Sequence, residues 1–335
     1  MLPMQNDTYE DFDDYPEYDP DYVPLINMAD VQTENVRWLW YPYFPSGKVT
    51  IVEGDPGEGK TMLTLAIASD LTKGIKPSGE GGITSPINVI YQTAEDGLAD
   101  TVKPRLEALG ADCSRVCVID ESSEQLTLTD SRIERAIRQT DAKLLIIDPL
   151  QAYLGLGVDM HRANEVRPVL RCIGDVADRT DCAVVIVEHM NKMRGGKAIH
   201  RGLGSVDISA AARSIILVGR PKSDSDIRAM AHIKSNLAPA GNTIGFKTDG
   251  GFQWLGKIDA TAEDIINNLS SDRAPKTQTA KDELVRLLTT NGEMSQKDVM
   301  EYFRMIGISE RTVNEVKLAL NVKSRRKGKQ WYWSI

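Results

Sequence analysis

The sequence lacks the features that would place the chain in a membrane or in a secretory pathway. It has no run of about 18 apolar residues, so no segment is long enough to cross a bilayer. Its N-terminus has no basic stretch followed by an apolar one, so a secretory signal is not expected. The absence of a membrane span and of a secretory signal predicts a cytoplasmic protein that does not interact with a membrane. The sequence also contains no internal repeat.

Cysteine is scarce, and the spacing of the four cysteines excludes the usual zinc sites. None of them forms a C-x-x-C pair. A zinc site needs paired ligands at short spacing, and this pattern is missing. We therefore expect the cysteines to be small, buried apolar residues in a reducing compartment. They are Cys113, Cys117, Cys172 and Cys182.

Positive charge is absent from the first thirty residues and concentrated at the other end. Residues 1–30 contain nine Asp and Glu and no Lys or Arg, whereas residues 277–335 contain eleven basic and seven acidic side chains. The overall charge of −8 therefore says little about nucleic-acid binding. We expect residues 1–30 to form a disordered or loosely docked acidic tail. This tail is either a solubilising segment or an acidic mimic that competes for a basic DNA-binding surface.

Between these ends, short apolar runs alternate with longer amphipathic stretches. Apolar runs of four or five residues are typical of buried parallel strands, and their alternation with helices predicts an α/β domain over residues 31–257. The expected strands are 49–52, 89–91, 116–119, 144–147, 183–187, 214–218 and 230–233. The expected helices are 61–71, 99–109, 130–139 and 165–179.

The remaining sequence predicts a linker and a second, smaller domain. Residues 258–278 show little apolar periodicity and are expected to be the linker. In residues 279–335 we expect helices at 280–288, 295–306 and 309–320, the last two capped by serines, and then a basic hairpin turning at 327–328. Three short helices and a basic hairpin are typical of a winged helix-turn-helix domain.

A complete phosphate-binding motif follows the first predicted strand of the α/β domain. Gly54-Asp-Pro-Gly-Glu-Gly-Lys60-Thr61 matches G-x-x-x-x-G-K-[ST] and opens a predicted helix, which is the context the motif requires. Its glycines let main-chain N–H groups surround phosphate oxygens, Lys60 reaches the β- and γ-phosphates of ATP, and the Thr61 hydroxyl binds Mg²⁺. The expected nucleotide-binding residues are Gly54, Asp55, Pro56, Gly57, Glu58, Gly59, Lys60, Thr61 and Met62.

Polar side chains at the ends of three further predicted strands complete the expected site. Asp148 ends an apolar run and is the second expected Mg²⁺ ligand. Glu95, just past another strand, is the expected general base that orients the attacking water, with a plain surface turn as the alternative. His189 and Asn191 could sense the γ-phosphate, although a histidine after a strand is often structural.

Six ordered motifs over residues 36–256 resemble the RepA-type branch of the RecA-like ATPases. They are GDPGEGKT, TAED, LLIID, EHMNK, RGLGSVDISAAARSIILV and HIKSNLAPAG. That branch is related to the hexameric replicative helicases and occurs on plasmids, phages and other mobile elements. The resemblance implies a RecA-like P-loop fold, ATP hydrolysis at the interfaces of a ring, with a homo-hexamer favoured, and single-stranded DNA in the central channel.

The resemblance also implies roles for basic residues outside the phosphate loop. Lys234 resembles the residue that ring helicases insert into the neighbouring subunit's site. Many of those helicases have Lys-x-Arg where this chain has Lys-x-Asn, so Arg213 and Arg228 are alternatives for the missing arginine. The basic loop 194–201 and, as a weaker candidate, residues 155–162 are expected to contact DNA.

The C-terminal residues resemble winged helix-turn-helix domains, which bind either duplex DNA or other proteins. The expected recognition helix is 310–320, with cations of the following hairpin placed against phosphates. We expect Trp331 and Trp333 in the core of this domain, with base stacking as the alternative. The helix is expected to expose Arg311, Thr312, Asn314 and Lys317, and the hairpin Lys323, Arg325, Arg326, Lys327 and Lys329.

These observations favour an ATP-hydrolysing motor that acts on DNA, a RepA-like replicative helicase. The alternative is an ATP-switched DNA-binding initiator or regulator that does not unwind DNA. A small-molecule P-loop kinase is the weakest hypothesis, because it would leave residues 279–335 without a role.

Overall fold

The computed structural model describes residues 23–78, 84–155, 157–159, 162–189, 211–224, 226–271, 276–306, 308–328 and 330–334. The chain divides into two compact units, residues 1–35 and residues 36–335. Most of the expected acidic tail, residues 1–22, lies outside the described residues. In the described part of the first unit every side chain is exposed, and a short 3-10 helix, η1 (Met28–Asp30), is capped by the Asn27 side chain.

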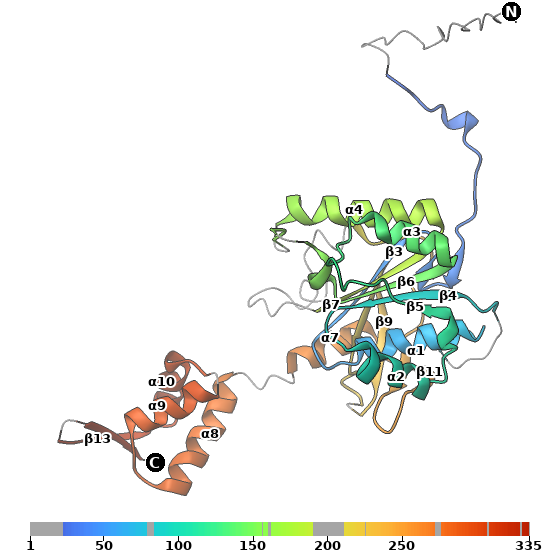
Figure 1. Cartoon of the computed structure of the whole chain (residues 1–335). Helices are drawn as coiled ribbons and strands as arrows, with labels where there is room; N and C mark the ends of the chain where they lie inside the picture. The colour runs from blue at the N-terminus through green and yellow to red at the C-terminus, as the bar shows by residue number, and fades with distance from the viewer. Residues whose placement is uncertain are drawn as a thin grey trace, which may run out of the picture. The chain divides into compact units, whose positions relative to one another are not determined.

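The second unit is built on one large sheet (Figure 1). In the described residues its strand order is β11-β10-β9-β8-β3-β7-β6-β4-β5. The strands are β3 (Val49–Gly54), β4 (Asn88–Thr93), β5 (Val116–Cys117), β6 (Ala142–Asp148), β7 (Ala183–His189), β8 (Ser214–Gly219), β9 (Arg228–Ser235), β10 (Ile244–Lys247) and β11 (Gln253–Lys257). Strands β8, β3, β7, β6, β4 and β5 pair in parallel, and β9 to β11 add antiparallel strands beside β8. The predicted α/β fold with a mainly parallel sheet is confirmed.

Helices cover both faces of this sheet (Figure 1). The helices that accompany it are α1 (Lys60–Thr72), α2 (Lys103–Ala108), α3 (Ser131–Thr140), α4 (Ala163–Thr180) and α7 (Ala262–Ser271), with the shorter turns η2 (Leu98–Val102), η3 (Cys113–Arg115) and η4 (Leu150–Tyr153). On one face, Ile133 of α3 and Ile173 of α4 share a core with Ile186 of β7. On the other face, Leu65 of α1 packs in a core with Val185. Neighbouring strand residues thus supply opposite cores, because side chains alternate across a strand.

Two predicted elements are shorter or more broken than their apolar patterns suggest. The strand expected at 116–119 ends at Cys117, because β5 is the edge strand and pairs only with β4. The helix expected at 99–109 is divided into the π-helical turn η2 and α2. Val102 donates to the Gly97 carbonyl five residues back, and Pro104 in the first turn of α2 has no N–H group to donate.

Several elements are not predicted by the sequence patterns. Helix α7 lies within the stretch expected to be a linker, and its Ile265 packs against Leu217 and Ala231 of the sheet. A two-stranded sheet of β1 (Trp38–Trp40) and β2 (Phe44–Pro45) precedes β3. Strands β10 and β11 are also additional. The four additional strands are short or aromatic, so they lack the aliphatic runs from which the other strands are predicted.

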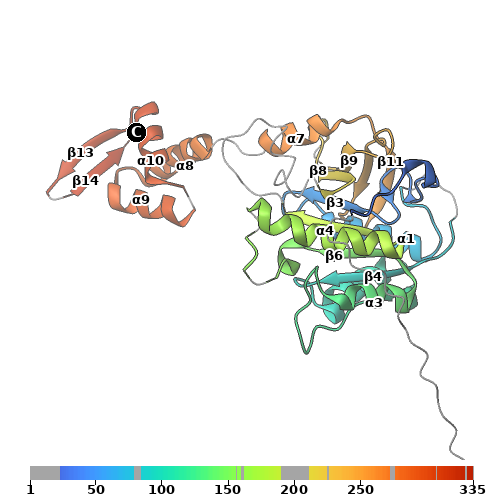
Figure 2. The ribbon, with the colours of Figure 1, turned by 90° about the horizontal axis from the view of Figure 1, so that it is seen from above.

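The C-terminal residues form a group of helices and a small sheet (Figure 2). The elements are α8 (Lys276–Asn291), β12 (Met294–Ser295), α9 (Gln296–Met305), α10 (Glu310–Ala319), β13 (Lys323–Lys327) and β14 (Gln330–Ser334), with strand order β12-β14-β13. Ser295 caps α9 by accepting from Asp298 N, and Ser309 caps α10 by accepting from Thr312 N. Gly328 takes a left-handed φ of 62° in the turn between β13 and β14. The three predicted helices, both serine caps and the hairpin are confirmed.

The predicted burial of tryptophan and cysteine holds only in part. Trp333 is fully buried, with Leu284, Phe303 and Val316 in the same core. Trp331 is 48% exposed, so its expected core position is wrong. Of the cysteines, Cys182 is buried and the other three are half-buried.

In the described ranges no helix has both the length and the apolar character of a membrane span.

Candidate nucleotide-binding site

The predicted phosphate-binding loop joins the end of β3 to the first residue of α1. Gly57 and Gly59 have φ angles of 85° and 86°, in the left-handed region that side chains disfavour. Gly54 is required for a different reason. A Cβ atom there would lie 2.2 Å from the carbonyl oxygen of Val218 on β8, which is too close for any side chain. The three glycines therefore allow this loop both its shape and its place against the sheet.

Lys60 lies at the centre of the loop and is almost fully buried, with 4% of its surface exposed. Its Nζ atom donates to the main-chain carbonyls of Gly54 at 2.7 Å and Asp55 at 2.9 Å. Burial lowers the pKa of the Lys60 ammonium, and the carboxylates of Asp148 and Asp55 oppose that change. The loop therefore surrounds a cation close to its own N–H groups, an arrangement suited to binding a polyphosphate.

Thr61 and Asp148 meet although they come from different elements. The Thr61 hydroxyl donates to Asp148 Oδ2 at 2.8 Å, and the Tyr91 hydroxyl donates to the same oxygen at 3.0 Å. Asp148 is 4% exposed and ends β6, where it pairs with Thr93 of β4. Burial and the Asp148 carboxylate raise the pKa of Tyr91 well above its usual value, so this hydroxyl stays a donor. Hydroxyl and carboxylate oxygens are hard ligands, and this donor pair fits Mg²⁺.

Glu95 lies at the same end of the sheet, two residues beyond the Thr93–Asp148 pair. Its side chain is exposed, and its carboxylate is one of the charges that oppose the lowering of the Lys60 pKa by burial, so it lies within electrostatic range of the phosphate loop. The neighbouring Asp96 is engaged instead by Arg105, whose Nη1 donates to it at 2.7 Å. Of the two adjacent acids, Glu95 is the more exposed.

Only the main-chain position of His189 is described. It ends β7 and pairs with Gly54, the first residue of the phosphate loop. Its side chain, Asn191 and the basic loop 194–201 lie outside the described residues, as do residues 156, 160 and 161 of the weaker DNA-binding candidate. Their predicted roles therefore stay predictions.

Glu188, next to His189, is a buried acid that the sequence interpretation missed. Only 3% of it is exposed, and burial raises its pKa to about 7, with Lys60 opposing this shift. In the described residues its Oε2 atom has no hydrogen-bond partner. A signal was present, because Val184-Val-Ile-Val-Glu188 has the same form as the apolar run that ends in Asp148.

Arg228 is buried against the phosphate loop of its own chain. It is 8% exposed, and a Cβ atom on Gly59 would lie 3.0 Å from its Cδ atom. Glu58 of the loop lies near two arginines, with Arg220 Nε at 3.5 Å. Burial raises the pKa of Glu58, and Arg220 and Arg228 oppose the shift. The Arg228 side chain is thus packed against the phosphate loop of its own chain. Its expected role as a substitute for the missing trans-acting arginine stays a prediction.

Lys234 and Arg213 are not brought to the phosphate loop. Strand β9 runs antiparallel to β8, so Arg228 lies at the loop end of the sheet and Lys234 at the opposite end. Lys234 Nζ donates to the Ala212 carbonyl at 2.9 Å. The pKa of Lys234 is lowered mainly by burial and, to a smaller extent, by the positive charge of Arg213. Arg213 is exposed. Within this chain these two cations therefore lie far from Lys60, at the other end of the sheet.

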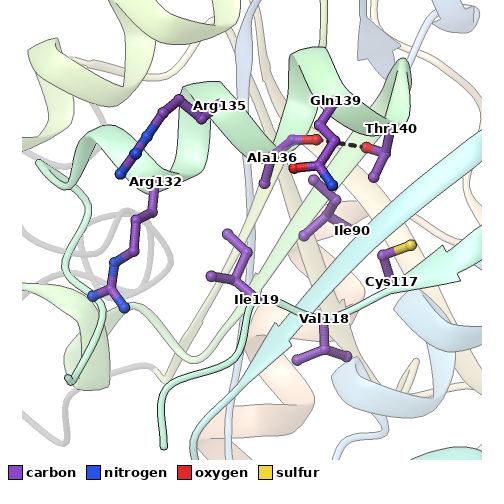
Figure 3. Close-up of a pocket in the computed structure, with 9 residues that line it drawn as sticks. All are labelled: Ile90, Cys117, Val118, Ile119, Arg132, Arg135, Ala136, Gln139 and Thr140. Atoms are coloured by element: carbon purple, nitrogen blue, oxygen red, sulfur yellow. Dashed lines mark hydrogen bonds between the residues drawn. The ribbon is translucent and has the colours of Figure 1, made fainter. Parts of the chain in front are cut away.

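Two hollows in the second unit lie away from the phosphate loop. The first, of about 500 Å³, is lined from one side by α3 and from the other by β5 and the residues after it (Figure 3). The second, of about 880 Å³, lies beside α4 and includes Arg213. None of their lining residues belongs to the phosphate loop, β6 or the segment after β4. Neither hollow is therefore part of the candidate nucleotide site.

Comparisons with known proteins give one family match. The model of the AAA_25 family, described as an AAA domain, matches residues 18–195. No curated protein matches the chain. Among solved structures, a KaiC-like protein from Pyrococcus horikoshii OT3 is 18% identical, with a TM-score of 0.45, and the match covers 65% of this chain and 99% of that one. A second solved structure, an ATPase domain, is 14% identical, with a TM-score of 0.47, and the match covers 64% of this chain and 86% of that one.

Proposed function

The chain belongs to the AAA_25 family of AAA domains, and on this premise we propose that it is an ATP-hydrolysing motor that acts on DNA. The family implies a P-loop ATPase that uses a nucleotide, usually with Mg²⁺. The observation that carries the proposal is the 2.8 Å hydrogen bond between Thr61 and Asp148 beside the buried Lys60, because it joins both halves of a Mg–nucleotide site.

Each polar group of this site has a distinct task in the proposed hydrolysis. The N–H groups of the loop and the Lys60 ammonium would hold the β- and γ-phosphates, and Thr61 and Asp148 would hold Mg²⁺, whose chemistry when bound would be to neutralise charge on the phosphate oxygens. Glu95 accepts a hydrogen bond from the attacking water and orients it toward the γ-phosphate. Tyr91 keeps Asp148 in place by donating to the oxygen that Thr61 also uses.

The proposed motor is an assembly of several copies, with a RepA-like hexameric ring favoured. Lys234 and Arg213 lie at the end of the sheet opposite the phosphate loop, so each can reach a bound nucleotide only on a second copy. An arrangement in which one end of each copy meets the other end of the next is head-to-tail, and it closes into a ring when the rotation permits. In the ring, the proposed trans-acting residue is Lys234, assisted by Arg213.

The C-terminal residues are proposed to be a winged helix-turn-helix domain that binds DNA. Helices α8 to α10 and the hairpin of β13 and β14 follow the order of that fold, and α10 would be its recognition helix. The hairpin presents Lys323, Arg325 and Arg326 with exposed side chains. Such cations supply the sequence-independent part of DNA affinity.

The test is ATP hydrolysis by the full chain with and without single-stranded DNA. We expect DNA to raise the turnover, and Lys60→Ala to abolish hydrolysis under both conditions. Lys73→Ala is the matched control, because Lys73 caps the other end of α1 and is far from the phosphate loop. Equal turnover with and without DNA would contradict a DNA-driven motor.

The second candidate is an ATP-switched protein that binds a duplex site without unwinding it. The exposed basic hairpin favours this alternative as much as it favours the motor. Strand separation on a forked substrate distinguishes the two. Protection of a defined duplex site together with an intact fork would support the switch, whereas ATP-dependent opening of the fork would support the motor.

A further inference from the structure

The hairpin of β13 and β14 carries cations that no acidic side chain among the described residues neutralises. All five residues of β13 are exposed, and four of them are Lys or Arg. Lys327 forms an ion pair with Glu293. In the part of the chain that the structure describes, the side chains of Lys323, Arg325 and Arg326 take part in no ion pair and no hydrogen bond. Unneutralised cations on a hairpin attract a polyanion.

An exposed tryptophan stands beside these cations. Trp331 pairs directly with Arg326 across the two strands, so both side chains lie on the same face of the hairpin. Trp333 is two residues further along on this face and fully buried in the helical core, whereas Trp331 is 48% exposed. The helices therefore cover this face at Trp333 and leave it open at Trp331. A large indole surface remains in water next to a guanidinium.

The neighbouring helix contributes no comparable positive charge. Helix α10 contains two acids and two bases, so its net charge is zero. Arg311 Nε lies 3.0 Å from Glu315 Oε1, and Lys317 Nζ lies 4.5 Å from the centre of the Trp333 ring. Both cations of the helix therefore already have partners within the protein. The attraction for a polyanion comes from the hairpin.

We propose that Trp331 stacks on an unpaired base of single-stranded DNA while Arg326, on the same face of the hairpin, contacts the adjacent phosphate. This inference rests on the proposed binding of DNA by the C-terminal residues. An aromatic ring beside an unneutralised cation suits single-stranded nucleic acid, since the ring stacks on a base and the cation binds the backbone. An intact duplex offers no such face, because its bases are stacked on one another.

The experiment measures the affinity of the full chain for a labelled single-stranded oligonucleotide, without nucleotide, at several salt concentrations. Trp331→Ala should weaken binding about tenfold, and Trp331→Phe should restore it to within about threefold of the original chain. The slope of affinity against salt should not change, because no charge is removed. Arg326→Ala should reduce this slope by about 0.7, the value for one phosphate contact on a single strand.

Two controls separate stacking from other losses. Val285→Ala removes another exposed apolar side chain, on α8 and away from the proposed recognition helix, and should leave affinity unchanged. A blunt duplex of the same length tests the requirement for an unpaired base, and Trp331→Ala should bind it as the original chain does. An equal loss on both DNAs would overturn the proposal.

The failure of stacking is distinguishable from the failure of DNA binding by these residues. If Trp331→Ala binds normally while the triple alanine variant of Lys323, Arg325 and Arg326 binds weakly, the stacking role is wrong and DNA binding by the hairpin stands. If neither variant changes the affinity, both the stacking role and the proposed DNA-binding role of the hairpin are wrong. The thermal unfolding of each variant shows whether the core around Trp333 has been kept.

Discussion

The hydroxyl of Thr61 and the carboxylate of Asp148 are 87 residues apart in sequence and 2.8 Å apart in space. The contact exists because β3 and β6 are both neighbours of β7 in the sheet and end at the same edge. Parallel strands place their carboxyl ends together, and ligands of open α/β sheets bind at that edge. The distance therefore supports the proposal that these two residues share one metal ion.

Loss of the Thr61 hydroxyl is expected to impair hydrolysis through the metal. Thr61→Ala should lower ATP turnover by about 100-fold, because a metal ion supplies several kcal/mol of charge stabilisation. Thr61→Ser keeps the hydroxyl and should retain activity. Thr64→Ala is a control on the same helix, where the hydroxyl donates only to the Thr61 carbonyl. Turnover is measured across a series of Mg²⁺ concentrations, and undiminished activity of Thr61→Ala would refute its metal role.

Glu95 is expected to affect the chemical step more than nucleotide binding. Glu95→Gln should lower kcat by about 10²- to 10⁴-fold with little change in ATP affinity, because an amide cannot accept the proton of the attacking water. Asp96→Asn is the matched control, since Asp96 is engaged by Arg105 and not by the loop. Steady-state kinetics and ATP binding are measured on both variants. A larger loss in Asp96→Asn than in Glu95→Gln would move the base to Asp96.

Gly59 is expected to tolerate no side chain. Gly59→Ala puts a Cβ atom 3.0 Å from Arg228 Cδ. The backbone there has a φ of 86°, and an alanine held in this left-handed conformation costs about 1–2 kcal/mol by itself. We expect a lower free energy of unfolding and weaker ATP binding. Gly174→Ala, in α4 with open space around it, should instead stabilise the protein by up to about 1 kcal/mol. Urea denaturation of both variants checks the contrast, and equal effects would argue against a constrained loop.

Glu188 is expected to make stability depend on pH. Its pKa of about 7 in the folded chain lies above the ordinary value of 4.5, so the folded chain holds this proton more tightly than the unfolded chain does. The contribution to stability is therefore greatest below about pH 4.5 and is lost as pH rises through 7. Glu188→Gln should be more stable than the original chain at pH 8, by about 1–3 kcal/mol, with a smaller gain at pH 5. Denaturation at both pH values tests this, and a gain that does not vary with pH would show that ionisation is not the cause.

Where local pattern and packing agree, the sequence predicts the structure well. Four consecutive aliphatic residues before Asp148 are compatible with a strand that is buried on both faces. The glycine-rich loop motif is found between a strand and a helix. The predicted strands at 49–52, 144–147 and 183–187 therefore lie within β3, β6 and β7. The caps at Ser295 and Ser309 follow from local hydrogen bonding, and both are present.

The features that the sequence interpretation missed depend on distant partners. Arg228 has the residue type of a trans-acting finger, and only the position of β9 shows that it packs against Gly59 of its own chain. Trp331 and Trp333 have the same alternation, but the helical core ends between them. The burial of Glu188 depends on strands that cover it from both sides. The packing of Arg228 and the exposure of Trp331 have no local signal, whereas Glu188 ends an apolar run of the same form as the run before Asp148.

The most direct test of the central claim is Mg²⁺-dependent binding of a fluorescent ATP analogue to the purified chain. The site proposed here predicts saturable binding that needs Mg²⁺ for full affinity, is lost in Lys60→Ala and is retained in Lys73→Ala. Absence of binding to the original chain, or equal binding to Lys60→Ala, would contradict the proposed nucleotide site.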